Sequence, residues 1–224
     1  GAPGSEPSST LPVWNVVPWH SAFLKVRDYQ WNEVGIPFWK KVQAFAADHD
    51  VKVCLEMHPG NIVFNPRTLE RLATEIDATH VGAEMDPSHL FWQGIDPTEA
   101  VRSLGSLVYN AAAKDTRINA LAKVNGTLDD GFTHVGKDDP GWLSLGGPHS
   151  LSGWPKDSSW DFVAVGRGHD VSWWAGFLGA LEAVDPDMAV NIEHEDQELG
   201  QMEGLQYAAD TLLQAARRRD HVGE

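Results

Sequence analysis

Short apolar runs that end in acidic or histidine side chains recur along the chain and constrain its fold more than any other feature. The run VKVCLEMH (51–58) carries Glu56 and His58 at its end, and HVGAEMDPSH (80–89) leads into Asp86 and His89. Near-continuous apolar runs of this length are typical of strands buried on both faces of a parallel sheet. An acid at the end of a buried strand is unfavourable unless a metal ion or a substrate uses its charge. The pattern therefore predicts an α/β fold with chemistry at the ends of its strands.

Helical segments alternate with five such runs. The starts of three helices are marked by the cap residues Asn65, Asp96 and Asp170, two of which are followed by proline. We treat the whole chain, 1–224, as one partial domain, with 1–28 as an N-terminal loop and 116–160 as a long irregular insertion. The expected strands are 51–60, 80–89, 106–115, 160–170 and 188–196, and the expected helices are 29–48, 65–76, 96–106, 171–184 and 202–219.

The net charge and the hydropathy pattern bear on the partners and the compartment. A formal charge of −15 works against binding to nucleic acid or to anionic membranes. The sequence contains no secretion signal and no apolar run long enough to span a bilayer. We therefore expect a cytoplasmic protein with no nucleic-acid or membrane partner, and the sequence leaves a homo-oligomer open.

The distribution of polar residues over several strand ends distinguishes between α/β architectures. A (β/α)₈ barrel places functional groups at the carboxyl ends of successive strands, whereas a doubly wound sheet gathers them at one switch point. No glycine-rich nucleotide-binding motif follows any predicted strand. A closed barrel needs eight strands, however. Five strands indicate either a compact five-stranded α/β sheet or a barrel of which three βα units lie outside this chain.

Five strand-end segments resemble those of the xylose isomerase-like TIM barrels in the sugar phosphate isomerase/epimerase superfamily, which also contains the endonuclease IV type of AP endonuclease. The resemblance implies a (β/α)₈ barrel of which this chain supplies about the last five βα units, the N-terminal units being absent. It further implies that an N-terminal fragment or a second chain completes the barrel. The segments are LEMHPG (55–60), DPSHLFWQGIDP (86–97), AAKD (112–115), GRGHD (166–170) and NIEHED (191–196).

The same resemblance implies one divalent metal ion, bound by Glu56, Asp86 and Glu193. The fourth ligand of the family, a histidine, falls on Ala112, so Asn110, His89, His169 or water would have to take its place. A carboxylate-rich set favours Mn²⁺ or Mg²⁺, while Zn²⁺ and Co²⁺ also fit oxygen and imidazole ligands.

The implied activity is that of a sugar isomerase or epimerase, in which a base removes a proton next to a carbonyl and the metal stabilises an enediolate. His58 lies two residues after Glu56 and therefore on the same face of the strand, which makes it an acid/base candidate. Three alternatives stay open: a keto-glycoside β-elimination lyase, a non-catalytic relative with a degraded metal site and, less favoured, an AP-endonuclease-like phosphodiesterase. The catalytic candidates are Glu56, Glu193, His58 and Lys114, and the substrate-binding candidates are His89, Trp92, His169 and Asn110.

Overall fold

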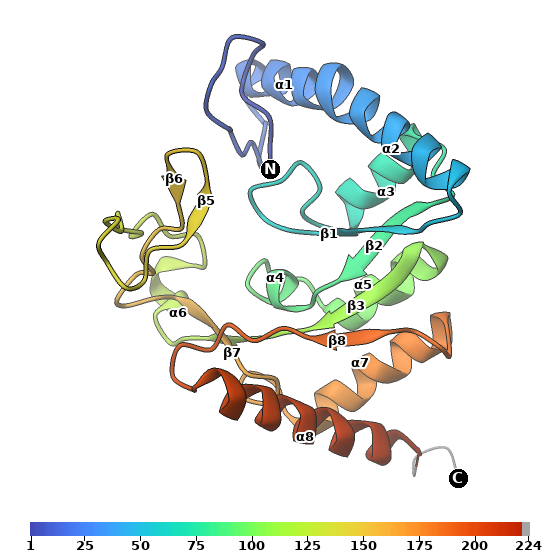
Figure 1. Cartoon of the computed structure of the whole chain (residues 1–224), viewed down its shortest axis with the longest axis vertical. Helices are drawn as coiled ribbons and strands as arrows, with labels where there is room; N and C mark the ends of the chain where they lie inside the picture. The colour runs from blue at the N-terminus through green and yellow to red at the C-terminus, as the bar shows by residue number, and fades with distance from the viewer. Residues whose placement is uncertain (221–224) are drawn as a thin grey trace.

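A parallel sheet with helices packed against its outer face forms the centre of the protein, which we describe over residues 1–220 of a computed structural model (Figure 1). The sheet has the strand order β1-β2-β3-β8, and all three strand pairs are parallel. Within the described residues, β1 and β8 each have one strand neighbour, so the sheet is an open arc. The four strands are β1 (Val53–Glu56), β2 (Val81–Met85), β3 (Val108–Ala113) and β8 (Val190–Ile192).

The outer face of the sheet carries the apolar core. Alternate residues of β2 and β3, such as Ala83 and Ala111, are buried there against the helices. The predicted caps are confirmed: the side chains of Asn65, Asp96 and Asp170 each accept a backbone N–H in the first turn of a helix. These helices are α3 (Pro66–Glu75), α5 (Pro97–Leu104) and α7 (Val171–Val184), and α2 (Ile36–Asp48) and α8 (Gln201–Asp220) complete the layer.

The N-terminal helical segment begins earlier than predicted. Helix α1 (Ser21–Asp28) occupies part of the expected loop, and a π-helix (Tyr29–Gly35) joins it to α2. His20 caps α1 through its ring nitrogen, which is a weaker sequence signal than Ser or Asp. Pro37 lies just beyond the π-helix, where it has no N–H to donate to the preceding turn; this explains the irregularity at that point.

The segment 116–160 is more ordered than predicted, and the expected parallel strand after it is wrong in its pairing. Strand β4 (Asp115–Ile118) continues the path of β3, and β7 (Trp160–Val163) pairs with it antiparallel. The sheet therefore contains four parallel strands rather than five, because β7 finds a partner in this extension. A short helix, α6 (Ala122–Asn125), and a hairpin of β5 (Ser144–Gly146) and β6 (His149–Ser150) lie between β4 and β7.

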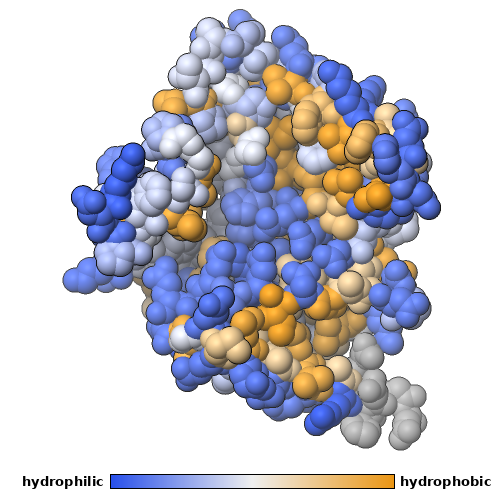
Figure 2. Space-filling view, in the orientation of Figure 1, coloured by the Kyte–Doolittle hydropathy of each residue, from blue (hydrophilic) through white to orange (hydrophobic). Residues whose placement is uncertain are grey.

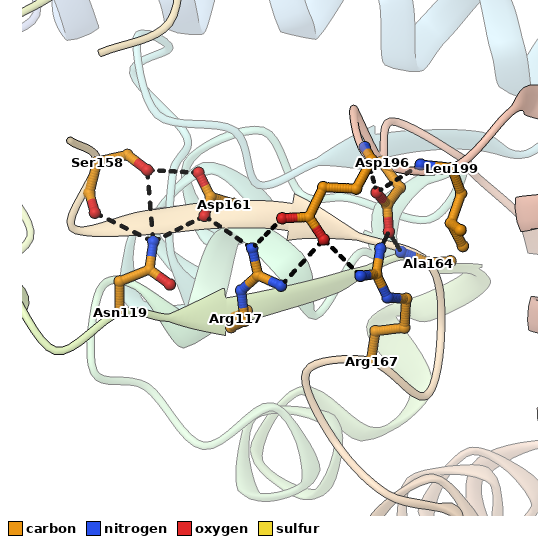
Figure 3. A network of polar contacts seen from close by, with 9 residues as sticks. Arg117, Asn119, Ser158, Asp161, Ala164, Arg167, Asp196 and Leu199 are labelled. Carbon is orange, nitrogen blue, oxygen red and sulfur yellow. Dashed lines mark hydrogen bonds and ion pairs between the residues drawn. The ribbon is translucent and has the colours of Figure 1, made fainter. Parts of the chain in front are cut away.

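A network of charged residues ties β4 and β7 to the segment that follows β8 (Figure 3). Arg117 of β4 lies 3.3 Å from the Asp161 carboxylate of β7 and 3.0 Å from that of Glu198. Arg167 contacts both Glu198 and the buried Asp196. The network holds the β4–β7 ribbon beside the carboxyl ends of the parallel strands.

None of the helices in the described part of the chain is long and apolar enough to cross a bilayer.

Candidate metal centre and active-site cleft

Three carboxylates converge at the carboxyl ends of three strands. Glu56 is the last residue of β1, Asp86 follows β2 directly, and Glu193 follows β8. One carboxylate oxygen from each lies within 4.8 Å of the other two. The strand ends meet at one edge of the parallel sheet, which is why residues so far apart in sequence come together. Carboxylates at this separation are the donors that a divalent cation such as Mn²⁺ or Mg²⁺ binds.

Asp86 fits a metal ligand because one of its oxygens is unpartnered. Its side chain is 1% exposed, and Oδ1 accepts the N–H of Ser88 at 2.8 Å. Oδ2 has no hydrogen-bond partner among the described residues. Burial raises the pKa of Asp86 well above its usual range, although Lys114 and Ser88 oppose the shift. A buried carboxylate in this state is stabilised by a bound cation.

His89 lies beside the triad on the short helix α4 (Ser88–Phe91). Its Nε2 is 3.1 Å from Glu56 Oε1 and 3.6 Å from Asp86 Oδ2, yet neither ring nitrogen has an aligned hydrogen-bond partner within residues 1–220. Burial lowers the pKa of His89, with Glu56 opposing the shift. Burial would raise the pKa of Glu56, but contacts with His89 and the nearby His58 outweigh it and lower the value to about 2. A neutral imidazole beside an ionised carboxylate is suited to metal binding.

Ala112 occupies the inner side of β3, in register with Asn191 of β8, and it offers no donor atom. Asn110, two residues earlier, donates to Asn191 at 3.1 Å and to Glu84 at 3.4 Å, so its amide is engaged deeper in the barrel. Of the residues named as replacements for the family histidine, His89 is the one that the structure places beside the carboxylate triad. Glu84 was not among the candidates; its pKa is raised by burial and by the charges of Glu56 and Glu193.

Lys114 carries a buried positive charge next to the triad. Its ammonium lies 3.3 Å from Glu193, 3.0 Å from Glu195 and 4.3 Å above the ring of Phe162. Burial alone would lower the pKa of Lys114, but the carboxylates of Asp86 and Glu195 outweigh it and raise the value. Neither Glu195 nor Phe162 was among the catalytic or substrate-binding candidates, although Glu195 lies in the same strand-end segment as Glu193.

His58 packs against His89, with the two ring centres 4.1 Å apart. Its Nδ1 contacts the carbonyl of Pro59. Because a carbonyl only accepts, this contact assigns a hydrogen to Nδ1, and Nε2 is the ring nitrogen that remains for another partner. Glu56, His58 and His89 form a second group whose ligand atoms lie within 4.8 Å of one another.

Two predicted substrate residues lie away from the triad and its neighbours. His169 stacks on Phe91 at 3.7 Å, and its Nδ1 contacts the buried Asp115 at 2.7 Å. Asp115 also accepts backbone N–H groups from Gly166, Gly168 and His169, so it fixes the turn before α7. Trp92 is buried and stacks on Trp160 at 4.9 Å.

A cleft of about 1650 Å³ is lined by His58, His89, Lys114, Phe162 and Glu195, among others. Figure 2 shows hydrophilic residues gathered at the centre of this face, and the surface is hollowed between them and the β5–β6 hairpin. His89 and Lys114 line the cleft and also contact the triad, so the cleft leads from solvent to the neighbours of the carboxylates.

Comparison with known proteins agrees with this architecture. The family model described as xylose isomerase-like TIM barrel matches residues 11–214. The uncharacterized protein YfiH of Bacillus subtilis (strain 168) is 34% identical over 218 residues, which are 96% of this chain and 63% of YfiH. The expected barrel fold and its partial extent are thereby confirmed. This chain spans less than two thirds of the length of that relative.

Two solved structures share the fold at low sequence identity. A xylose isomerase domain protein from Planctomyces limnophilus superposes with a TM-score of 0.56 at 16% identity, over 92% of this chain and 58% of that one. The IOLI protein, whose crystal structure holds a zinc atom, gives a TM-score of 0.53 at 17% identity, over 86% of this chain and 58% of that one.

Proposed function

This chain belongs to the xylose isomerase-like TIM barrel family, and from that membership we propose that it is a divalent-metal-dependent enzyme of the sugar isomerase or epimerase type. The observation that carries the proposal is the convergence of Glu56, Asp86 and Glu193 within 4.8 Å, beside His89 and Lys114, which line the cleft. The unpartnered Oδ2 of Asp86 supports a cation at this point. Three carboxylates favour Mn²⁺ or Mg²⁺. Zn²⁺ is also a candidate metal, because His89 lies beside the carboxylates and the crystal structure of the IOLI protein holds a zinc atom.

The chain's own residues supply the rest of the chemistry. A divalent ion held by the three carboxylates would polarise a carbonyl and an adjacent hydroxyl of a bound keto-sugar. Glu193, whose side chain is 44% exposed, would remove the proton from the carbon next to the carbonyl. His58 offers Nε2 to the sugar hydroxyl and moves its proton. Lys114 stabilises negative charge that develops on the oxygens.

A β-elimination lyase acting on a keto-glycoside is the second candidate. It begins with the same proton removal and then expels a substituent from the neighbouring carbon. The length of the cleft favours it, because the cleft continues past His58 to the aromatic residues Trp154 and Trp160 and leaves room for a leaving group. The products formed from a keto-sugar and from a keto-glycoside would separate the two activities.

Metal content and proton exchange test the proposal together. The protein is expressed, dialysed against Mn²⁺ or Zn²⁺ and assayed for bound metal by plasma mass spectrometry. We expect one ion per chain in the wild type and less than about a tenth of that in Glu56→Gln and Asp86→Asn, because each removes a ligand charge. Asp138→Asn, at an exposed position outside the cleft lining, is the matched control.

Activity is read as metal-dependent exchange of deuterium from solvent into keto-sugars, followed by NMR. Unchanged metal content in both ligand variants would contradict the metal site. Bound metal without exchange or turnover on any keto-sugar or keto-glycoside would favour the non-catalytic alternative.

A further inference from the structure

A second cavity, separate from the metal centre, lies between the loops at the carboxyl ends of the strands. Its volume is about 250 Å³. An apolar cavity of roughly 150 Å³ already admits a benzene ring in a protein interior, so a six-membered ring fits this one. The lining is largely aromatic: Trp14, Trp92, Phe132 and Trp154 lie in loops and turns and Trp160 begins β7, with Pro59, Leu128 and Pro155 between them.

Ring contacts pack the aromatic walls against one another. Trp92 stacks on Trp160, and Trp154 meets Trp160 edge to face at 4.8 Å. Phe132 packs edge to face on Trp154 at 5.2 Å and is 42% exposed, which places it at the rim. Rings arranged in this way present flat apolar surfaces, on which sugar and aromatic rings stack.

Several polar groups in these walls have no partner. The indole N–H groups of Trp14, Trp92 and Trp154 and the hydroxyl of Ser159 are buried without a hydrogen bond to any described residue. Trp160 is satisfied, because it donates to the carbonyl of Thr127 at 3.1 Å. These polar atoms are themselves buried, so a ring in the cavity would meet the flat faces and edges of the indoles rather than their N–H groups.

The cavity adjoins the large cleft, and a line of aromatic rings leads from its wall toward His89. Trp160 contacts Phe162 at 5.1 Å, and Phe162 contacts His89 at 5.3 Å and lies under the Lys114 ammonium. Trp154, Phe132 and Trp160 line both the cavity and the large cleft. A molecule bound in the cleft beside His89 and Lys114 can therefore extend along this wall into the cavity.

We infer that the aromatic cavity is a subsite for a second six-membered ring of the substrate, so that the enzyme acts on a glycoside rather than on a single free sugar. The ring is either an aryl group or a second sugar, since both offer a flat face for stacking on tryptophan. The inference that this ring belongs to the substrate rests on the proposed function. The inference that the cavity binds a ring is independent of the proposed function.

Calorimetric titration of the full chain with methyl β-glucoside, phenyl β-glucoside and cellobiose tests the subsite, with Mn²⁺ and again with EDTA. We expect phenyl glucoside or cellobiose to bind at least about tenfold more tightly than methyl glucoside, because a second ring is removed from water. A gain for phenyl glucoside alone identifies an aryl subsite, and a gain for cellobiose identifies a sugar subsite. Equal affinity for all three would overturn the inference.

Variants at the rim locate the binding. Phe132→Ala and Leu128→Ala change partly or largely exposed side chains of the cavity and leave the core intact. Each should reduce the gain from the second ring by about fivefold. Phe38→Ala and Leu213→Ala, at exposed positions on α2 and α8, are matched controls and should leave it unchanged. If both rim variants keep the full increase in affinity from the second ring, the inferred subsite would also be contradicted.

The variant Glu56→Gln separates the two proposals. If it loses metal but keeps the preference for the second ring, both stand. If wild-type protein shows the ring preference in EDTA yet binds no metal, the proposed function fails while the subsite holds. If metal binds but the ring preference is absent, the subsite alone fails.

Discussion

Nε2 of His89 lies 3.1 Å from Oε1 of Glu56. Neither nitrogen of the buried His89 ring has an aligned hydrogen-bond partner among the described residues. Ala112, where the resemblance places a histidine ligand, offers only a methyl group. An imidazole thus reaches the carboxylate triad from α4 instead of from β3. This arrangement has consequences that can be measured.

Replacing His89 should weaken metal binding and change its selectivity. We expect His89→Ala to reduce the affinity for Zn²⁺ by about 10–100-fold, since a neighbour that ligates or orients a ligand has an effect of this order. The affinity for Mg²⁺ should change less, because Mg²⁺ prefers oxygen donors. Competition with a chelating dye measures both. His134→Ala, at an exposed position, is the control, and equal losses for the two ions would contradict a role for the imidazole as ligand.

Metal binding should also stabilise the fold. At a free metal concentration of 100 Kd, a single site adds about 2.7 kcal/mol to the free energy of unfolding, which is roughly 5–10 °C in Tm for a chain of this size. The shift should disappear in Asp86→Asn, which keeps the acceptor of the Ser88 N–H but loses the charge. Differential scanning calorimetry with and without EDTA measures the shift in Tm. An equal Tm shift in Asp86→Asn and in the wild type would mean that the metal binds elsewhere.

His58→Gln should separate catalysis from metal binding. The free Nε2 of His58 is the acceptor proposed to move a hydroxyl proton, and loss of such a group lowers kcat by about 10²–10⁴-fold. Bound metal should stay near one ion per chain, because three carboxylates remain. Parallel measurement of turnover and metal content tests this; full activity would remove His58 from the mechanism.

Asp115 should matter for stability rather than for metal binding. Its carboxylate is fully buried and accepts three backbone N–H groups of residues 166–169 as well as Nδ1 of His169. Asp115→Ala leaves these donors unpaired, so we expect a loss of roughly 2–4 kcal/mol in the free energy of unfolding. Urea denaturation measures the loss. Asp157→Ala is the exposed control, and its effect should stay within about 0.5 kcal/mol.

Acid stability should depend on Asp196. Burial would raise its pKa, but the N–H groups of Ala164 and Glu198 and the charge of Arg167 outweigh it and lower the pKa below the ordinary 3.8. Because the folded-state pKa is the lower one, the stabilisation is present above pH 3.8 and is lost as the pH falls through the folded-state value. The free energy of unfolding should therefore fall less steeply below pH 4 in Asp196→Asn than in the wild type. Identical slopes in urea titrations at pH 7, 4 and 3 would contradict this.

Much of the local structure follows from the sequence alone. Asn65, Asp96 and Asp170 cap helices where their patterns predict, since a cap depends only on neighbouring residues. The apolar runs that precede Asp86 and Glu193 form parallel strands as expected. Both acids therefore come to one edge of the sheet, because every strand of a parallel sheet ends on the same side.

Other features were decided by tertiary structure, since they depend on contacts between distant segments. The pairing of β7 with β4 required an extension of β3 that no local pattern marks. The approach of His89 to Glu56 depends on the direction of a single turn, α4, and the engagement of Asn110 with Glu84 and Asn191 depends on strand register. The aromatic cavity combines residues from loops, turns and the start of β7. The sequence by itself determined which side chains reach the strand ends, because that follows from local periodicity; only the packing of the strands and loops decided which of them meet.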